Sequence, residues 1–388
     1  MAKPTILAVC GTRPDAIKMA PVVLSMREYD DWNVRFVASG QHREILRQAL
    51  DFFGLEPDRD YALMQEKQTL NYITVSALNA MESAIFDYKP DLVIAQGDTT
   101  TTLCAAIQAF YHTIPFAHVE AGLRTPTIHS PFPEEFNRRT TSLITELHFA
   151  PTRKAAENLL REGVPESRVF ITGNTSIDAV LAVANKLTEW KPFTEGRMLL
   201  VTTHRRENWG EPQRRICRAI VEVLKRFQDC YAVVPMHPNQ TVREVLRECF
   251  SDCERVFLIE PPDYPGFVQL MKNAYLILSD SGGVQEEAPS LGKPVLVLRE
   301  ETERPEGIEA GAAILVGTSE KTILEEASRL LSSGEDYRRM AQTRNPYGDG
   351  LSAKRIVNEI RRYFGLSFTE IPPFADVLTR QGKGMSAG

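Results

Sequence analysis

The chain has 388 residues, of which 43% are hydrophobic and 25% charged, and its formal net charge is −6. These values are typical of a folded globular protein and exclude a disordered, collagen-like or low-complexity chain. The acidic balance argues against nucleic acid or an anionic membrane as a partner, because both attract basic proteins.

The first ten residues, the longest uncharged stretch and the cysteines favour a cytoplasmic protein. The first ten residues lack the basic region, apolar core and cleavage site of a signal peptide. The longest uncharged stretch, residues 99–119, contains Thr, His and Gln and is predicted to be a buried helix and strand, not a membrane span. The six cysteines form no CxxC pair, so we expect six reduced thiols and no metal site.

Short β-branched runs alternate with helical patterns along the whole chain. Such alternation predicts parallel sheets built from βαβ units, and one open sheet would be too small for all the strands. We therefore predict an α/β protein with two Rossmann-like parallel-sheet domains. In chain order the predicted strands are 5–9, 34–38, 92–95, 115–119 and 148–150, and then a second series at 169–172, 199–203, 232–235, 256–259, 276–279, 294–298 and 313–316.

A loop at residues 190–196 separates most of the second series from the first and has the composition of a linker. We place the first domain at 1–170 and the second at 171–350. An amphipathic helix is predicted at 351–364 and is expected to return to the first domain. Periodicity is lost in the tail, residues 365–388.

Three acids are predicted to lie at the ligand-binding edge of the first sheet, where the strands end. Asp98 follows the third predicted strand, Glu120 follows the fourth, and Glu134 begins a helix after a long loop. Capping of a helix by Asp98 and a favourable helix dipole at Glu134 are the simpler explanations. Clustered carboxylates repel one another, which moves some pKa values into the range of general acid–base catalysis. We call these three residues the acid cluster.

Basic loops follow other strands and predict an anion site. In the first domain, Arg13 and Lys18 lie at the start of a helix, although a solvated charged loop would have the same sequence. In the second domain, His204 and Arg205 follow the strand at 199–203. His237 follows the next strand and is a weaker candidate.

The strongest phosphate signal is the segment Ser281, Gly282 and Gly283 between a strand and a helix, because glycines let the N–H groups of a helix start approach a phosphate. Glu287 lies one turn into that helix, where it could bind a ribose, and Arg304 follows the next strand. GxGxxG and GxxxxGK[ST] motifs are absent, which argues against a nicotinamide cofactor and P-loop chemistry. Together these residues predict a nucleotide sugar held between the two domains.

The chain resembles the non-hydrolysing UDP-N-acetylglucosamine 2-epimerases over about residues 4–364. The matching motifs are GTRPDAIKMAP, QGDTTTT, HVEAGLRT, PFPEEFNRR, TGNTSIDA, THRREN, SDSGGVQEEAPSLGKPVLVLR, TERPE and NPYGDG. The resemblance implies the glycosyltransferase-B (GT-B) fold, two domains facing across a cleft, and usually a homodimer. It also implies interconversion of UDP-GlcNAc and UDP-ManNAc with no cofactor and no metal, which would supply ManNAc units for cell-surface polysaccharide.

The same resemblance implies a role for each matching residue. UDP is eliminated to leave a 2-acetamidoglucal, and it adds back after the proton returns to the other face of C2. The acid cluster would move the protons at C2. The implied ligands of the diphosphate are Arg13, the catalytic His204 and the backbone of Ser281, Gly282 and Gly283, with Lys18 and Arg304 supporting UDP binding and Glu287 holding the ribose.

The chain departs from the family pattern in a few places. Asp15 replaces a common Glu, and Pro262 stands where some relatives have a glutamine near the uracil. Relatives that are activated by a second UDP-GlcNAc have glutamine where this chain has Glu44 and arginine where it has Lys67. The remaining residues of that allosteric site match, namely Gln41, Arg205 and His237. Activation by substrate is therefore left open.

Four alternatives follow from the same pattern. A hydrolysing 2-epimerase would release ManNAc and UDP, but its first loop typically lacks the Pro-Asp/Glu-Ala-Ile-Lys run found here. An epimerase of a modified UDP-sugar would share the motifs. A glycosyltransferase would need an acceptor and would leave the acid cluster without a role, and a sugar-nucleotide sensor would need no acids at C2.

Overall fold

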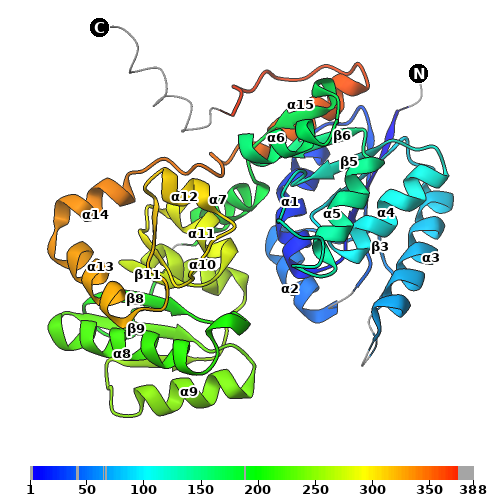
Figure 1. Ribbon diagram of the computed structural model, residues 1–388. Coiled ribbons are helices and arrows are strands. Elements are labelled where there is room, and N and C mark those ends of the chain that lie inside the picture. Colours follow the sequence, from blue (N-terminus) through cyan, green and yellow to red (C-terminus); the bar gives the residue numbers. More distant parts are fainter. Residues whose placement is uncertain (1–2, 41–42, 64, 66–67, 188, 375–388) are drawn as a thin grey trace, which may run out of the picture. The chain divides into compact units, whose positions relative to one another are not determined.

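The structure is a computed structural model that describes residues 3–40, 43–63, 65, 68–187 and 189–374 (Figure 1). It divides into two compact units. Unit 1 runs to Ala179 and resumes at Gly348, and unit 2 is Val180–Tyr347. The division falls within a helix, whereas the sequence analysis placed it at residue 170. The predicted fold class, two α/β domains with parallel sheets, is confirmed.

Within the described residues, unit 1 is built on a seven-stranded parallel sheet in the order β3-β2-β1-β4-β5-β6-β7. Its strands are β1 (Thr5–Cys10), β2 (Asn33–Ala38), β3 (Arg59–Asp60), β4 (Leu92–Gln96), β5 (Phe116–Val119), β6 (Leu147–Ala150) and β7 (Val169–Ile171). Its helices are α1 (Arg13–Arg27), α2 (Arg43–Phe53), α3 (Leu70–Tyr88), α4 (Thr100–Tyr111), α5 (Glu134–Leu143), α6 (Arg153–Arg161), η1 (Glu166–Arg168) and α15 (Ser352–Tyr363), and α7 (Thr175–Lys186) carries the division.

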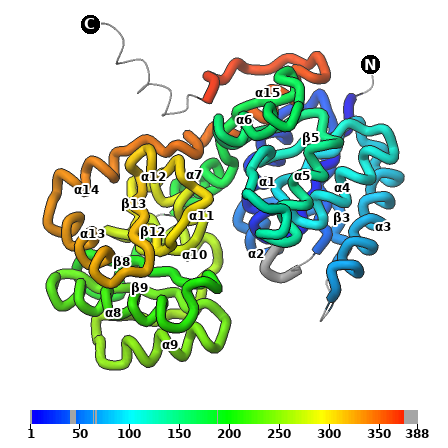
Figure 2. Tube along the Cα trace, viewed as in Figure 1, coloured from blue at the N-terminus to red at the C-terminus, as the bar shows by residue number. Residues whose placement is uncertain are grey.

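Two layers of helices enclose this sheet (Figure 2). Side chains alternate between the two faces of a strand. Leu7 and Val9 of β1 and Val93 and Ala95 of β4 therefore share one face, and α3 and α4 cover it. The other layer contains α1, which packs against α2 and α15. The result is a three-layer core in which the ends of the strands are free to carry functional loops.

Two strands of this sheet differ from the predictions. The sequence analysis assigned the strand at 169–172 to the second series, but β7 pairs with β6 in the first sheet, with Val169 beside His148. β6, α6 and β7 form an ordinary βαβ unit. The hydrophobic pattern of the sequence alone did not show which of the two sheets the strand at 169–172 joins. The short strand β3 was missed because Arg59 and Asp60 are exposed charged residues without a strand pattern.

The described part of unit 2 contains a six-stranded parallel sheet in the order β10-β9-β8-β11-β12-β13. Its strands are β8 (Arg197–Thr202), β9 (Cys230–Pro235), β10 (Val256–Ile259), β11 (Leu276–Ser279), β12 (Val295–Val297) and β13 (Ala313–Leu315). Its helices are η2 (Arg206–Asn208), α8 (Glu211–Arg226), α9 (Gln240–Phe250), α10 (Tyr264–Asn273), α11 (Gly282–Glu287), η3 (Ala288–Leu291), α12 (Pro305–Glu309), α13 (Glu320–Ser332) and α14 (Gly334–Ala341). Of the described helices, none has both the length and the apolar composition needed to cross a membrane.

The helix near the end of the chain, α15, belongs to unit 1 and packs on α1. Its Arg361 is almost fully buried and donates two hydrogen bonds to Asp31, each 2.7 Å long. The guanidinium also stacks on Tyr29, with its carbon 3.8 Å from the ring centroid, and lies 4.9 Å from the centroid of Trp32. An ion pair and two aromatic faces thus hold α15 against the segment between α1 and β2.

Candidate active site

The loops after β1 and β4 lie side by side in unit 1, because these central strands are neighbours and the strand order reverses between them. Asp15 joins the two loops. Its Oδ2 accepts hydrogen bonds from the backbone N–H of Gly11 (3.2 Å) and Thr12 (3.0 Å) and from the hydroxyl of Thr99 (3.2 Å). Burial raises the pKa of Asp15 to about 6. The loop that begins with Arg13 is therefore tied to the loop of Asp98.

Asp98 forms an ion pair with Arg138 of α5. Its Oδ2 accepts from Arg138 Nε at 2.8 Å and lies 2.6 Å from Nη2. Asn137, one residue earlier, donates to the backbone carbonyl of Asp98 at 2.8 Å. Glu134 begins the same helix, so the start of α5 is docked on the loop after β4. Arg138 was missed as a site residue, although its place one turn after Glu134 in the PFPEEFNRR motif was a usable signal.

Glu120 lies beside this loop in a strained backbone conformation. Its φ of +66° is in the left-handed region, which is uncommon for a residue other than glycine. A Cβ atom placed on Gly97 would be 3.7 Å from Glu120 Oε2. His118, two residues earlier, is hydrogen-bonded through Nε2 to the Gly97 carbonyl at 2.7 Å, and burial lowers its pKa to about 4. Strain of this kind is often found at functional sites.

Polar groups from three elements contact the Glu120 carboxylate. Lys18, expected to support UDP binding, has its Nζ 2.5 Å from Oε1. Asn174 donates to the same oxygen at 3.1 Å, and Gln96 donates to Oε2. The sequence analysis did not identify Asn174 or Gln96 as site residues, although both lie in motifs that it quoted.

The third acid, Glu134, is partly buried, and its Oε2 has no hydrogen-bond partner among the described residues. The structure therefore places Asp98, held by Arg138, and Glu120, held by Lys18, at the ends of neighbouring strands. Glu134 begins α5, the helix whose Asn137 and Arg138 bond to Asp98. Arg13 is the first residue of α1 and is partly exposed.

In unit 2, the central strands β8 and β11 are neighbours and their loops carry His204 and Asp280. His204 Nδ1 is 2.8 Å from Asp280 Oδ1, and the Asp280 carboxylate also accepts from the backbone N–H of His204 and Arg205 and from the Asn208 amide. Asp280 is fully buried. Burial opposes its charge, but the hydrogen bonds from His204 and Arg205 prevail and hold its pKa below the usual range. Asp280 was missed, although it stands in the SDSGG motif.

Two guanidinium groups converge beside Gly282. A Cβ atom placed there would lie 3.6 Å from Arg304 Nη2 and 3.7 Å from Arg205 Nη2. Arg304 Nε donates to Glu286 Oε1 at 2.5 Å, and Glu286 is buried. The sequence analysis selected the neighbouring, partly buried Glu287 and not Glu286. Ser281 precedes α11, and Gly283 is exposed at its start.

The residues of the possible allosteric site are only partly described. His237 stacks on His204, with ring centroids 6.2 Å apart and an interplanar angle of 24°. Gln41 and Lys67 lie outside the described residues, and Glu44 lies in α2 without a described side chain.

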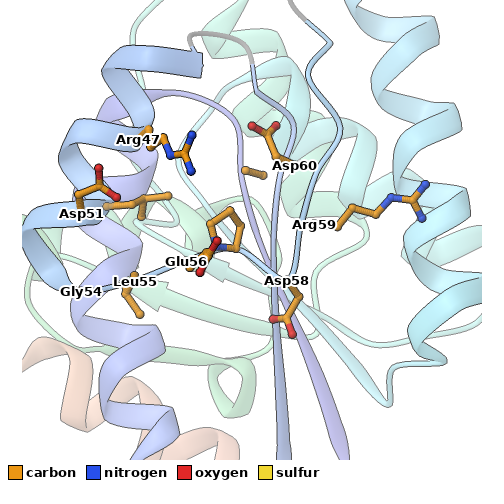
Figure 3. Close-up of a pocket in the computed structure, with 11 residues that line it drawn as sticks. Arg47, Asp51, Gly54, Leu55, Glu56, Asp58, Arg59 and Asp60 are labelled. Carbon is orange, nitrogen blue, oxygen red and sulfur yellow. The ribbon is translucent and has the colours of Figure 1, made fainter.

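A cavity of about 550 Å³ lies in unit 1 between α2 and the segment that contains β3 (Figure 3). Charged residues of α2 and of the β3 segment are labelled around it, among them Arg47, Asp51 and Asp60. Among the described residues that line this cavity, none belongs to the acid cluster or to the predicted diphosphate ligands. It is therefore separate from the acid cluster.

Comparisons with known proteins agree over nearly the whole chain. A family model described as UDP-N-acetylglucosamine 2-epimerase matches residues 25–361. The chain is 47% identical to the UDP-N-acetylglucosamine 2-epimerase of Bacillus subtilis over 368 residues, which cover 94% of this chain and 97% of the relative. It is 46% identical to the enzyme of the same name from Escherichia coli K12, with 92% and 98% covered.

Solved structures also match this chain over nearly its whole length. The Neisseria meningitidis UDP-GlcNAc 2-epimerase bound to UDP-GlcNAc superposes with a TM-score of 0.85 at 44% identity and covers 92% of this chain and 100% of its own. The S. aureus MnaA–UDP structure gives 0.86 at 40% identity, with 96% and 100% covered. The matches in sequence and in fold extend over both units, and the chain therefore belongs to the UDP-N-acetylglucosamine 2-epimerase family.

Proposed function

We propose that this protein is a non-hydrolysing UDP-GlcNAc 2-epimerase that interconverts UDP-GlcNAc and UDP-ManNAc. The observation that carries the proposal is the acid cluster at the end of β4, with Glu120 in a strained backbone conformation. A protein that only binds a nucleotide sugar has no need of three carboxylates at this edge of the sheet. The family relationship supports the choice of substrate.

The reaction requires elimination, because the C2 hydrogen of the sugar is not adjacent to a carbonyl group. A base removes the proton from C2, the electron pair of that bond forms the C1=C2 double bond, and UDP leaves with the electrons of the C1–O bond. UDP then adds back to C1 while a proton is delivered to the other face of C2. Because the sugar begins and ends at the same oxidation level, the reaction needs no redox cofactor.

Unit 2 supplies the groups that stabilise the leaving diphosphate in this proposal. The guanidinium groups of Arg205 and Arg304 beside Gly282 place positive charge at one edge of the sheet, and the His204 imidazole, oriented by Asp280, lies on the loop after the neighbouring strand β8. Cationic groups held in place in advance are most effective where negative charge develops. Arg13 and the backbone of the segment 281–283 are proposed to bind the same diphosphate, and Glu287 the ribose.

Unit 1 supplies the acid–base groups. Asp98, Glu120 and Glu134 are proposed to remove and return the proton at C2. Lys18 forms an ion pair with Glu120, and we propose that it also supports UDP binding.

The test is proton NMR of the purified protein with UDP-GlcNAc in D₂O and without added cofactor. We expect UDP-ManNAc as the minor species at equilibrium, with deuterium at C2 of both sugars. Free ManNAc and UDP would assign a hydrolysing epimerase. No change in UDP-GlcNAc, with turnover of a modified UDP-sugar, would contradict the proposed substrate.

We also propose that the protein is a homodimer that associates through α3 and α4. These helices pack against each other and expose Val75, Phe86, Phe110 and Tyr111, each of which keeps 49–71% of its surface accessible. Exposed aromatic groups gathered on adjacent helices are typical of an interface. Sedimentation velocity is expected to give a dimer for the wild type and a monomer for Phe110→Asp. A monomeric wild type would contradict this proposal.

The cytoplasm is the proposed location, and the proposed use of the product, UDP-ManNAc, is to supply ManNAc units for cell-surface polysaccharide. All six cysteines are free thiols, which favours a reducing compartment. Fractionation of cells that produce the protein tests the location. Loss of ManNAc from the cell surface after deletion of the gene tests the use of the product.

A further inference from the structure

The carboxylate of Glu120 lies in a cradle of three donors that come from three different parts of unit 1. Lys18 of α1 approaches Oε1 to 2.5 Å, Asn174 before α7 donates to Oε1 at 3.1 Å, and Gln96 at the end of β4 donates to Oε2. The Glu120 side chain is only 8% exposed, so these donors replace most of its contact with water.

The two amides are buried donors. Asn174 and Gln96 are each 3% exposed. The Oδ1 of Asn174 accepts the backbone N–H of Ser176 at 3.0 Å, so its NH₂ group must be the one that faces Glu120. The backbone carbonyl of Gln96 accepts the hydroxyl of Thr102 at 2.7 Å, which fixes the end of β4. The Asn174 amide therefore cannot rotate without losing its hydrogen bond to Ser176. The Oε1 of Gln96 is buried without a hydrogen-bond partner among the described residues, so the contact that orients this amide is its donation to Glu120.

Donors directed at a carboxylate stabilise its ionised form, and a nearby ammonium group adds to the effect. The left-handed backbone at Glu120 is strained for a residue other than glycine. Packing does not explain the strained backbone at Glu120, because the carboxylate contacts three polar groups and not an apolar core.

We propose that Gln96 and Asn174 are positioning residues that keep Glu120 ionised, so that Glu120 enters the reaction as a proton acceptor. This inference rests on the proposed 2-epimerase function. In the elimination, Glu120 as a carboxylate takes one proton and becomes a neutral acid, while the electron pair released at C2 passes to the C1=C2 bond and the C1–O pair leaves with UDP. The acid then releases the proton before the next cycle.

Other titratable groups lie on the elements around Glu120. Burial raises the pKa of Asp15 on α1 and of Asp178 on α7 to about 6. Burial lowers the pKa of His118 on β5 to about 4, so it is neutral at higher pH. Lys18 of α1, Asp98 after β4, and Glu134 and Arg138 of α5 are the further charged groups of this region. The wild type and the variants share all of these groups, so a difference between their pH profiles reports on the replaced amide.

The experiment compares the pH profiles of kcat/KM for UDP-GlcNAc from pH 4.5 to 9. Gln96→Leu removes one donor, and Asn174→Asp replaces a donor by a like charge while keeping the oxygen that accepts from Ser176. Loss of one hydrogen bond to a charged group is expected to move the acid limb up by about one pH unit, and the like charge by more than one. The control is Gln108→Leu, which removes a buried glutamine of α4 outside the predicted site and is expected to leave the limb unchanged.

The outcomes separate the two proposals. A wild type that does not turn over UDP-GlcNAc contradicts the proposed function. An active wild type whose acid limb is unmoved in folded Gln96→Leu and Asn174→Asp overturns the role of the cradle. Should Gln96→Leu fail to fold, Asn174→Asp decides the question, because it preserves the turn at Ser176. A uniform loss of activity at every pH indicates a merely structural role and also overturns the proposal.

Discussion

Replacement of Asp280 by asparagine is expected to lower kcat for UDP-GlcNAc by about ten- to a hundredfold. The Asp280 carboxylate is fully buried and accepts hydrogen bonds from the ring and backbone N–H groups of His204 and from the backbone of Arg205. Asparagine has the same shape, but one of its two polar groups is a donor and cannot accept from these N–H groups. The variant therefore loses the charge that orients the imidazole.

The magnitude follows from the 2.8 Å contact between His204 Nδ1 and Asp280. A hydrogen bond to a charged group contributes about 1.5–3 kcal/mol, and about 1.4 kcal/mol corresponds to a factor of ten in rate. If this contact holds His204 where the diphosphate gains charge, its loss lowers kcat by about one to two orders of magnitude. KM is expected to change less, because Arg205 and Arg304 remain beside Gly282.

The assay follows conversion of UDP-GlcNAc by NMR for the wild type, Asp280→Asn and a matched control, Asp263→Asn. Asp263 caps α10 in the same unit and accepts the Gly266 N–H at 2.9 Å. Its replacement keeps an acceptor at the cap and is expected to leave kcat unchanged. Equal kcat values for the two variants, with both folded by circular dichroism, would refute the orientation of His204 by Asp280.

Three further predictions concern the acid cluster and the stability of unit 1. The amide variant of each acid is expected to lower kcat by about a hundredfold or more, and normal turnover in all three would refute their roles in proton transfer. In urea unfolding, Asp31→Ala is expected to lower the free energy of unfolding by about 3 kcal/mol, because it leaves the buried Arg361 guanidinium without its carboxylate. Arg361→Met is expected to lower it by less, and equal losses would contradict this. Burial raises the pKa of Asp178 to about 6, so between about pH 4 and 6 the folded state keeps a proton that the unfolded state has lost. Stability is therefore expected to fall as pH rises through that range, and Asp178→Asn should remove this part of the pH dependence.

The sequence predicted the fold well, because parallel strands buried on both faces are nearly continuous apolar runs. Leu92–Gln96, for example, is buried at every position and was identified almost to its ends. The exceptions had a physical reason. Charged, exposed residues form β3, and the pairing of β7 with β6 depends on the path of the chain and not on local composition.

The candidate site was predicted at the level of the acidic and basic residues and not at the level of their partners. Asp98 bonds to a residue 40 positions away, Glu120 to Asn174 at 54 positions, and His204 to Asp280 at 76. A motif indicates that a residue lies at the end of a strand, but which side chain meets it depends on the strand order and on the crossing helices. Arg138, in the same motif as Glu134, was the partner nearest to detection.

In each unit a buried aspartate accepts hydrogen bonds from the loops of the candidate site. In each sheet the site loops follow two central strands, β1 and β4 or β8 and β11, and such loops leave N–H groups without sheet partners. Asp15 accepts from both loops in unit 1, and Asp280 follows β11 and accepts from the loop after β8 in unit 2. A carboxylate can do this because it offers several acceptor sites and no donor. Since each aspartate holds its loops through hydrogen bonds to the protein itself, the fold positions the loops that carry the proposed catalytic groups. Groups held in place by the fold are most effective in the electrostatic stabilisation of a leaving group.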